Sequence, residues 1–155
     1  MIRPTPVEPI DLWERDGSLR DVYVLNTTLD DWAVFLEVAA QYGYLYSHDG
    51  QDQPLPTPEI IFAGHDRARV LHLKVGRATV NCHFFVPSEI ELDLDPREIL
   101  EDADHFAILQ FLETLSLATK KKLLLTAENC PDIRYLSYDP ATEDWQIFQP
   151  PAQCK

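Results

Sequence analysis

The sequence is poor in the residues on which many catalytic motifs depend. Only 5 glycines occur among 155 residues, which argues against a glycine-rich loop that cradles a phosphate group. The spacings GxxxxGK[ST], GxGxxG, HExxH, CxxC and GxSxG are all absent, so the common nucleotide-binding, zinc-protease, redox and hydrolase signatures are excluded. No cofactor is therefore expected, and the sequence is more typical of a binding protein than of an enzyme.

Long apolar runs and paired cysteines are also missing. No stretch of about 18 apolar residues occurs, so no membrane-spanning helix is predicted, and the first 18 residues contain no apolar segment typical of a signal peptide. The cysteines are odd in number and irregularly spaced: Cys82, Cys130 and Cys154. This usage favours a reduced, cytoplasmic protein in which Cys82 is a small buried residue.

Positive charge is scarce, with 13 Lys and Arg against 26 Asp and Glu, a net charge of −13. This balance argues against a non-specific nucleic-acid binder or a protein that binds anionic membranes, and it allows a basic protein partner. Between Glu89 and Asp104 there are eight acids and one base, a net of −7. That acidic segment is interpreted either as a solubilising surface or as a recognition surface for a basic protein.

The clearest structural pattern spans residues 69–95, which are predicted to form three consecutive antiparallel strands. Gly76-Arg77 is a two-residue loop with glycine first, typical of a type II′ hairpin turn that pairs Val75 with Ala78. Residues 86–88 are predicted to make the second connection. The pairs expected across it are Phe84–Ile90, Cys82–Leu92 and Val80–Leu94. Because side chains alternate along a strand, one face is then apolar and the other polar.

Around this meander the sequence predicts an α+β fold, a mainly antiparallel sheet with two main helices packed on it. Residues 1–18 are expected to form an extended N-terminal arm, residues 19–149 a single domain, and residues 150–155 a C-terminal tail. Thr28 is the expected N-cap of a helix that runs to about Tyr42, with Gly43 as its C′ residue. A short helix is predicted at 58–64 and a second long helix near 104–121, ended by the basic triplet 120–122.

The polar face of the meander offers two hypotheses for a site. In the first, His72, His83 and Glu91 bind a metal, because imidazoles and carboxylates on one sheet face are suitable ligands for Zn²⁺ or a non-haem metal. In this register His83 lies opposite Glu91, and the alternative interpretation, an ordinary cross-strand pair on a solvated sheet face, is the more common one for such residues. An enzyme or a metal-binding protein would use this face.

In the second hypothesis, the same face binds a basic protein partner. Carboxylates spaced along one strand attract a cationic surface, and an exposed aromatic side chain beside them can anchor it. The residues predicted to bind the partner are Phe85, Glu89, Glu91, Asp93 and Asp95. A third interpretation is a structural or adaptor domain whose sheet edge pairs with itself or with another chain.

Three stretches resemble an uncharacterised bacterial domain family: LRDVYVLNTTLDDW, NCHFF followed by EIELDLDP, and LLLTAENCPDIRYLSYDP. As a small acidic α+β chain without catalytic motifs, the protein is also similar to bacterial immunity proteins that neutralise toxins and to small anti-restriction or anti-nuclease inhibitors. This resemblance is to a class of proteins. It implies an inhibitor that binds a protein, and it assigns no role to any residue.

Overall fold

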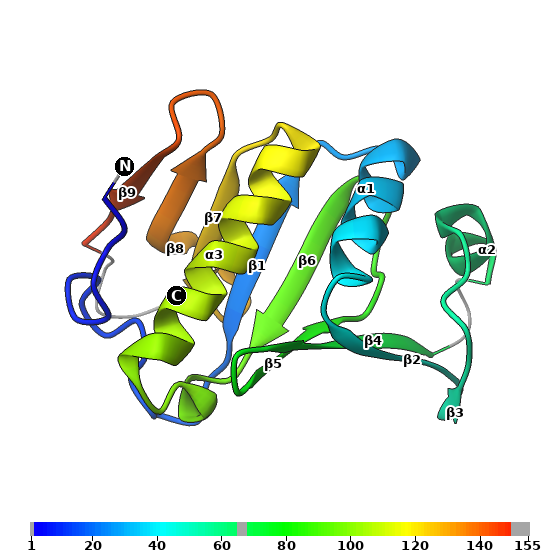
Figure 1. Ribbon diagram of the computed structural model, residues 1–155, viewed down its shortest axis with the longest axis horizontal. Coiled ribbons are helices and arrows are strands. Elements are labelled where there is room, and N and C mark those ends of the chain that lie inside the picture. The colour runs from blue at the N-terminus through cyan, green and yellow to red at the C-terminus, as the bar shows by residue number, and fades with distance from the viewer. Residues whose placement is uncertain (1, 65–67, 150–155) are drawn as a thin grey trace.

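A computed structural model, which describes residues 2–64 and 68–149, shows an α+β fold built on one open antiparallel sheet (Figure 1). The nine strands lie in the order β3-β2-β4-β5-β6-β1-β7-β8-β9, which places β6 at the centre. Their bounds are β1 Arg20–Leu25, β2 Gly43–His48, β3 Gln51–Asp52, β4 Arg69–Val75, β5 Ala78–Cys82, β6 Glu89–Leu94, β7 Leu123–Ala127, β8 Cys130–Asp139 and β9 Asp144–Ile147.

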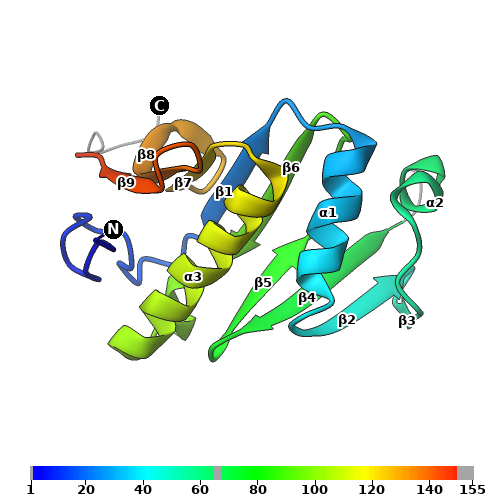
Figure 2. The same cartoon turned by 45° about the horizontal axis from the view of Figure 1, so that its top comes forward.

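The two longer helices cover the same face of this sheet. Helices α1 (Leu29–Ala39) and α3 (Asp102–Thr119) are in contact with each other and lie over the central strands, whereas α2 (Pro58–Ala63) stands at one end, beyond α1 (Figures 1 and 2). The hydrophobic core fills the space between these helices and the sheet. No helix in the described part of the chain covers the opposite side of the sheet, which we call the open face.

Helix α1 begins as predicted and ends early. Thr28 and Asp31 form a capping box, in which each side chain accepts a hydrogen bond from the backbone N–H of the other. The predicted apolar stripe is buried, and it consists of Trp32, Phe35, Leu36 and Ala39. The helix ends at Ala39, before the predicted end at Tyr42. Gly43 opens β2 rather than capping the helix, so that part of the prediction is wrong.

The β4–β5 hairpin has the predicted register, with Val75 opposite Ala78. Gly76 has a φ of 62°, the left-handed backbone that the first position of this turn requires. It also lies against α3, because a Cβ atom at this position would stand 3.1 Å from Cβ of Ala107. Glycine is therefore needed here both for its backbone conformation and for the close approach of the helix.

We expect Gly76→Ala to destabilise the protein more than Gly50→Ala does. Gly50 also has a positive φ, of 80°, but a Cβ atom there meets nothing within 4 Å. In both variants, alanine at a positive φ lowers the free energy of unfolding by about 1–2 kcal/mol. Gly76→Ala should lower it by about 1 kcal/mol more, because its Cβ atom lies too close to α3. Urea denaturation of both variants measures the difference. Equal losses would show that α3 does not constrain this turn.

The second half of the predicted meander is shorter than expected. Cys82 pairs with Leu92 as predicted, but the β5–β6 ladder contains only this pair and Asn81–Asp93. The predicted pairs Phe84–Ile90 and Val80–Leu94 are not part of it. Phe84 has a φ of 55° and is completely buried, so the chain leaves the strand there to place this ring in the core. On its other side β6 pairs along its full length with β1.

The N-terminal arm is folded back onto the domain. Instead of one extended segment, residues 6–13 make successive turns, and Leu12 is buried in the core. The Arg3 guanidinium donates to the Glu113 carboxylate of α3 at 2.8 Å, and the Trp13 indole donates to Nδ1 of His105 at 2.9 Å. The arm is thus held on α3 by specific polar contacts. The predicted C-terminal tail, residues 150–155, lies outside the described residues.

The cysteines differ in state. Cys82 is a free and buried thiol, as predicted, and burial raises its pKa to about 12. Cys130 is disulfide-bonded, which does not agree with the expectation that the thiols are reduced. Cys154 lies outside the described residues. No helix in the described part of the chain is long and apolar enough to cross a membrane.

Candidate functional site

The open face carries a group of carboxylates at the centre of the sheet. Glu89, Glu91 and Asp93 project from β6, and Asp21 projects from the neighbouring β1, directly opposite Asp93. Their alternation with buried Ile90, Leu92 and Leu94 follows the strand period of two. We call Asp21, Glu89, Glu91 and Asp93 the acidic patch.

A chain of hydrogen bonds connects the acidic patch to β4. His72 Nδ1 and Asn81 Oδ1 are 2.6 Å apart, and the Asn81 amide donates to Asp93 Oδ1 at 2.9 Å. His72, Asn81, Asp93 and Asp21 occupy successive positions of one cross-strand row. His83 Nε2 lies 3.5 Å from Asp93 Oδ2. These contacts fix the orientation of Asp93, whereas no described side chain orients the carboxylates of Glu89 and Glu91 in this way.

Two members of this region, Asp21 and Tyr23, were not identified from the sequence. Asp21 is buried, and its Oδ2 accepts hydrogen bonds from the Asn129 backbone at 2.8 Å and the Tyr23 hydroxyl at 3.3 Å. Burial is the main cause that raises the pKa of Asp21, with the charge of Asp93 adding to it. The alternation in RDVYVL indicates the face of Asp21 and Tyr23, but the placement of β1 beside β6 could not be read from it.

Glu91 is the electrostatically strained member of the acidic patch. Its pKa is raised to about 7, first by partial burial and then by the negative charges of Asp21, Glu89 and Asp93. Among the described residues, no Lys, Arg or His forms an ion pair with Glu91, Glu89 or Asp21. Near neutral pH this part of the surface is therefore negative, and none of the described cationic side chains balances the charge of Glu89, Glu91 or Asp21.

We expect Glu91→Gln to stabilise the protein at pH 8 and to leave it nearly unchanged at pH 5. The folded-state pKa of Glu91, about 7, lies above its ordinary value of 4.5. The folded protein therefore binds this proton more tightly, and stability is lost as the pH rises through 7. Because the carboxylate is only partly buried, solvent screening limits the gain to about 1–2 kcal/mol. Urea denaturation at both pH values tests this, with exposed Glu59→Gln as the control. A gain that is equal at pH 5 and pH 8 would contradict it.

Several acids of the predicted acidic segment form ion pairs or cap helices, rather than leaving their charge free for a partner. Asp95, predicted to bind the partner, accepts a hydrogen bond from the Arg97 backbone at 2.9 Å and pairs with its guanidinium at 2.7 Å. Hydrogen bonding to Arg97 lowers the pKa of Asp95. Glu101 and Asp104 form the capping box of α3, and Asp104 also pairs with Arg77 at 2.9 Å. The free charge of the acidic patch therefore does not extend along β6 to Asp95.

Exposed apolar side chains flank the acidic patch. Phe85 is 60% exposed, and its ring stacks on His83 with centroids 5.5 Å apart and an angle of 23° between the planes. Leu25, at the end of β1, is 45% exposed and lies opposite Glu89. An ordered aromatic ring and an exposed leucine beside desolvated carboxylates are typical of the centre of a protein interface.

The structure does not bring the three predicted metal ligands together. His83 lies within ion-pair distance of Asp93 rather than Glu91, and His72 uses Nδ1 to contact Asn81. Within residues 2–64 and 68–149, no group of three or more His, Cys, Asp or Glu side chains is arranged to hold a metal ion. Cys82 is also a poor candidate nucleophile, because its raised pKa keeps the sulfur as a thiol and its full burial keeps it away from any substrate.

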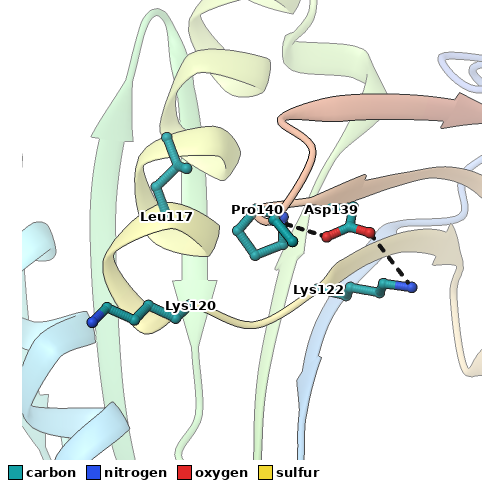
Figure 3. A pocket seen from close by; sticks show the side chains of 6 residues that line it. Leu117, Lys120, Lys122, Asp139 and Pro140 are labelled. Carbon is teal, nitrogen blue, oxygen red and sulfur yellow. Dashed lines mark hydrogen bonds and ion pairs between the residues drawn. The ribbon is translucent and has the colours of Figure 1, made fainter.

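A hollow of about 450 Å³ lies at the C-terminal end of α3 and is lined by Lys120 and Lys122 of the basic triplet (Figure 3). Lys120 ends the helix in the left-handed conformation, with φ 59°. Lys122 pairs with Asp139 at 3.7 Å, and Figure 3 shows that its side chain and that of Lys120 point in opposite directions. Lys121 pairs with Asp31 at 3.2 Å. The triplet therefore does not converge on one anion, which agrees with its interpretation as the end of a helix.

Comparisons with known proteins found no matching family model, no similar curated protein and no similar solved structure. The function is therefore inferred from the geometry of the open face.

Proposed function

We propose that this protein is a binding module that receives a basic protein partner on the acidic patch of its open face. One observation carries the proposal: Glu89 and Glu91 stand at the centre of the sheet with no cationic partner among the described residues, and the pKa of Glu91 is raised to about 7 by burial and by its acidic neighbours. A Lys or Arg side chain of a partner would relieve this repulsion. The repulsion within the acidic patch lowers the stability of the unbound protein, and its relief on binding would contribute to the binding free energy.

The flanking residues support the same mode of binding. Phe85 supplies an exposed aromatic ring that His83 already holds in place, so little conformational entropy is lost when a partner covers it. Asp93 is oriented by Asn81 and His83, which suits a directional contact to a guanidinium group. A toxin-neutralising immunity protein is the most concrete form of this proposal, because a basic toxin needs an acidic, rigid inhibitor surface.

The test is capture of a partner from lysate of the source organism at about 50 mM and about 500 mM salt, repeated with two matched variants. Glu91→Lys with Asp93→Lys reverses the charge of the acidic patch. Glu143→Lys with Asp144→Lys makes the same charge change at exposed positions at and before the edge strand β9. We expect a stoichiometric basic protein that binds the wild type and the β9 variant and elutes at high salt. Mass spectrometry identifies it.

With the partner in hand, stopped-flow measurements give the association rate. Charge reversal at Glu91 and Asp93 should slow association by about tenfold or more at low salt and reduce the dependence of the rate on salt. Circular dichroism verifies that the variant is folded. Equal association rates for the two variants would exclude the acidic patch as the binding surface, even if the partner itself is genuine.

A further inference from the structure

The strand β2 has an outer edge that is largely uncovered. It is followed by the two-residue strand β3, which pairs only with Ser47 and His48 at the C-terminal end of β2 (Figure 2). Gln53 donates one further hydrogen bond to the Tyr46 carbonyl. Among the described residues, no strand lies along the outer side of Gly43, Tyr44 and Leu45, and all three are exposed. This part of the sheet ends in backbone without a neighbouring strand.

The orientation of this backbone follows from the hairpin. His48 and Gln51 flank the two-residue turn Asp49-Gly50, so the N–H and C=O groups of His48 point toward β3. Backbone groups alternate along a strand, so those of Tyr46 and Tyr44 point to the same outer side, as the bond from Gln53 to Tyr46 requires. Tyr44 therefore presents both a donor and an acceptor to an incoming strand.

The outer edge of β2 also lacks the features that normally prevent another strand from pairing with an edge strand. Outer strands are usually protected by charged residues, proline or a bulge, whereas Gly43, Tyr44 and Leu45 carry no charge. Leu45 is 49% exposed and Tyr44 is 44% exposed. At the opposite edge of the sheet, the four-residue strand β9 begins with the exposed Asp144. The β9 edge therefore carries a charged residue, whereas residues 43–45 of the β2 edge carry none.

A hollow of about 420 Å³ beside β2 adds chemical selectivity. It is lined on the open face by Gly43, Leu45, His72, Lys74 and Thr79. On β2, Gly43 lies between the outer edge and Lys74, its partner on β4. Because Gly43 has no side chain, a side chain that comes from beyond the edge can cross β2 there to reach Lys74. A Cβ atom at Gly43 would make only an ordinary contact with Lys74, at 3.7 Å. Lys74 is exposed and forms no ion pair with a described residue.

We propose that the outer edge of β2 binds an extended peptide segment of a partner protein, which adds a strand to the sheet and carries an acidic and an apolar residue two positions apart. The peptide backbone bonds to Tyr44. Its acidic side chain passes over Gly43 to Lys74, a separation of about 10 Å between Cα atoms two strands apart, which two long side chains span. Its apolar side chain packs on Leu45. A second copy of this chain is disfavoured because each copy carries a charge of −13.

This inference does not depend on the acidic patch, because β4 and β5 lie between β2 and β6. A random dodecapeptide library displayed on phage provides the probe. It is panned against the wild type, and the enriched peptides are synthesised and measured by fluorescence anisotropy. We expect proline-poor sequences with an acidic and an apolar residue at positions i and i+2. Their effects on amide shifts in NMR spectra should centre on Tyr44 and its neighbours Gly43 and Leu45.

Three variants decide the outcome. Lys74→Glu reverses the charge that the peptide acid meets, and Gly43→Leu fills the path above β2. Each should weaken binding by about tenfold or more. Ile60→Lys, at an exposed apolar position of α2, should leave binding unchanged. Enriched peptides that bind all variants equally, or no enrichment, would overturn the proposal. A wild-type dimer that Leu45→Lys converts to monomer in light-scattering measurements would also overturn it in favour of self-pairing.

Discussion

Arg20→Met is expected to lower the free energy of unfolding by about 3–5 kcal/mol. Arg20 is only 1% exposed, and its guanidinium lies 5.0 Å from the centre of the Tyr135 ring. It donates hydrogen bonds to the Leu12 carbonyl at 2.6 Å and to the Asp11 carbonyl at 3.0 Å. Methionine would fill much of the volume but would leave these carbonyls unpaired. Because a buried carbonyl without a donor, here that of Leu12, is costly, the N-terminal arm should lose its attachment to the sheet.

The matched control is Arg15→Met. Arg15 belongs to the same arm and is exposed, and it makes one hydrogen bond of 3.3 Å, to the Ile99 carbonyl. Its replacement should cost less than about 1 kcal/mol. Urea denaturation measures both variants, and limited proteolysis of residues 2–18 tests whether the loss begins with release of the arm. An Arg20→Met variant as stable as Arg15→Met would mean that water replaces the guanidinium at no cost.

His105→Leu is expected to lower the free energy of unfolding at pH 8 by about 2–4 kcal/mol. His105 is completely buried in α3 and joins two points of the N-terminal arm. Its Nδ1 accepts from the Trp13 indole, and its Nε2 donates to the Pro4 carbonyl at 2.8 Å. These partners require the neutral ring with the proton on Nε2. Leucine is similar in size but leaves the Trp13 donor and the Pro4 acceptor buried without partners.

Burial of His105 is also expected to make the protein less stable in acid. Burial lowers the pKa of His105 in the folded protein, against the opposing influence of the Pro4 carbonyl and Asp102. The unfolded chain therefore takes up this proton first, at about pH 6.5, and stability falls as the pH drops below that value. The difference in stability between wild type and His105→Leu should consequently shrink between pH 8 and pH 5. This difference isolates His105 from Glu91, whose protonation acts in the opposite direction.

Urea denaturation at pH 8, 6.5 and 5 tests both statements. The control is His83→Leu, because His83 is half-exposed and its contacts, an ion pair with Asp93 and stacking on Phe85, lie at the surface, so its replacement should change the free energy of unfolding by less than about 1 kcal/mol. The Trp13 indole resonance in NMR spectra reports directly on the hydrogen bond to Nδ1. A difference between wild type and His105→Leu that stays constant with pH would refute the buried neutral imidazole.

Local features of this protein were determined by the sequence alone. Residues 69–95 predict the hairpin at Gly76, the face of every carboxylate on β6 and the exposure of Phe85, because the strand period of two and the turn chemistry act over only a few residues. The capping residues of α1 and its buried stripe follow from the helical period in the same way. The α+β class follows from the succession of such segments.

Only the tertiary structure decided which segments lie beside one another. The pairing of β1 with β6 places Asp21 and Tyr23 against the β6 carboxylates, and strands about 70 residues apart give no local signal of their pairing. The same holds for the docking of the N-terminal arm on α3 through His105, which contacts Pro4 about 100 residues away in the chain. Sequence periodicity fixes the face on which a side chain lies, whereas its neighbours, and hence its pKa and its chemistry, depend on strand order and packing.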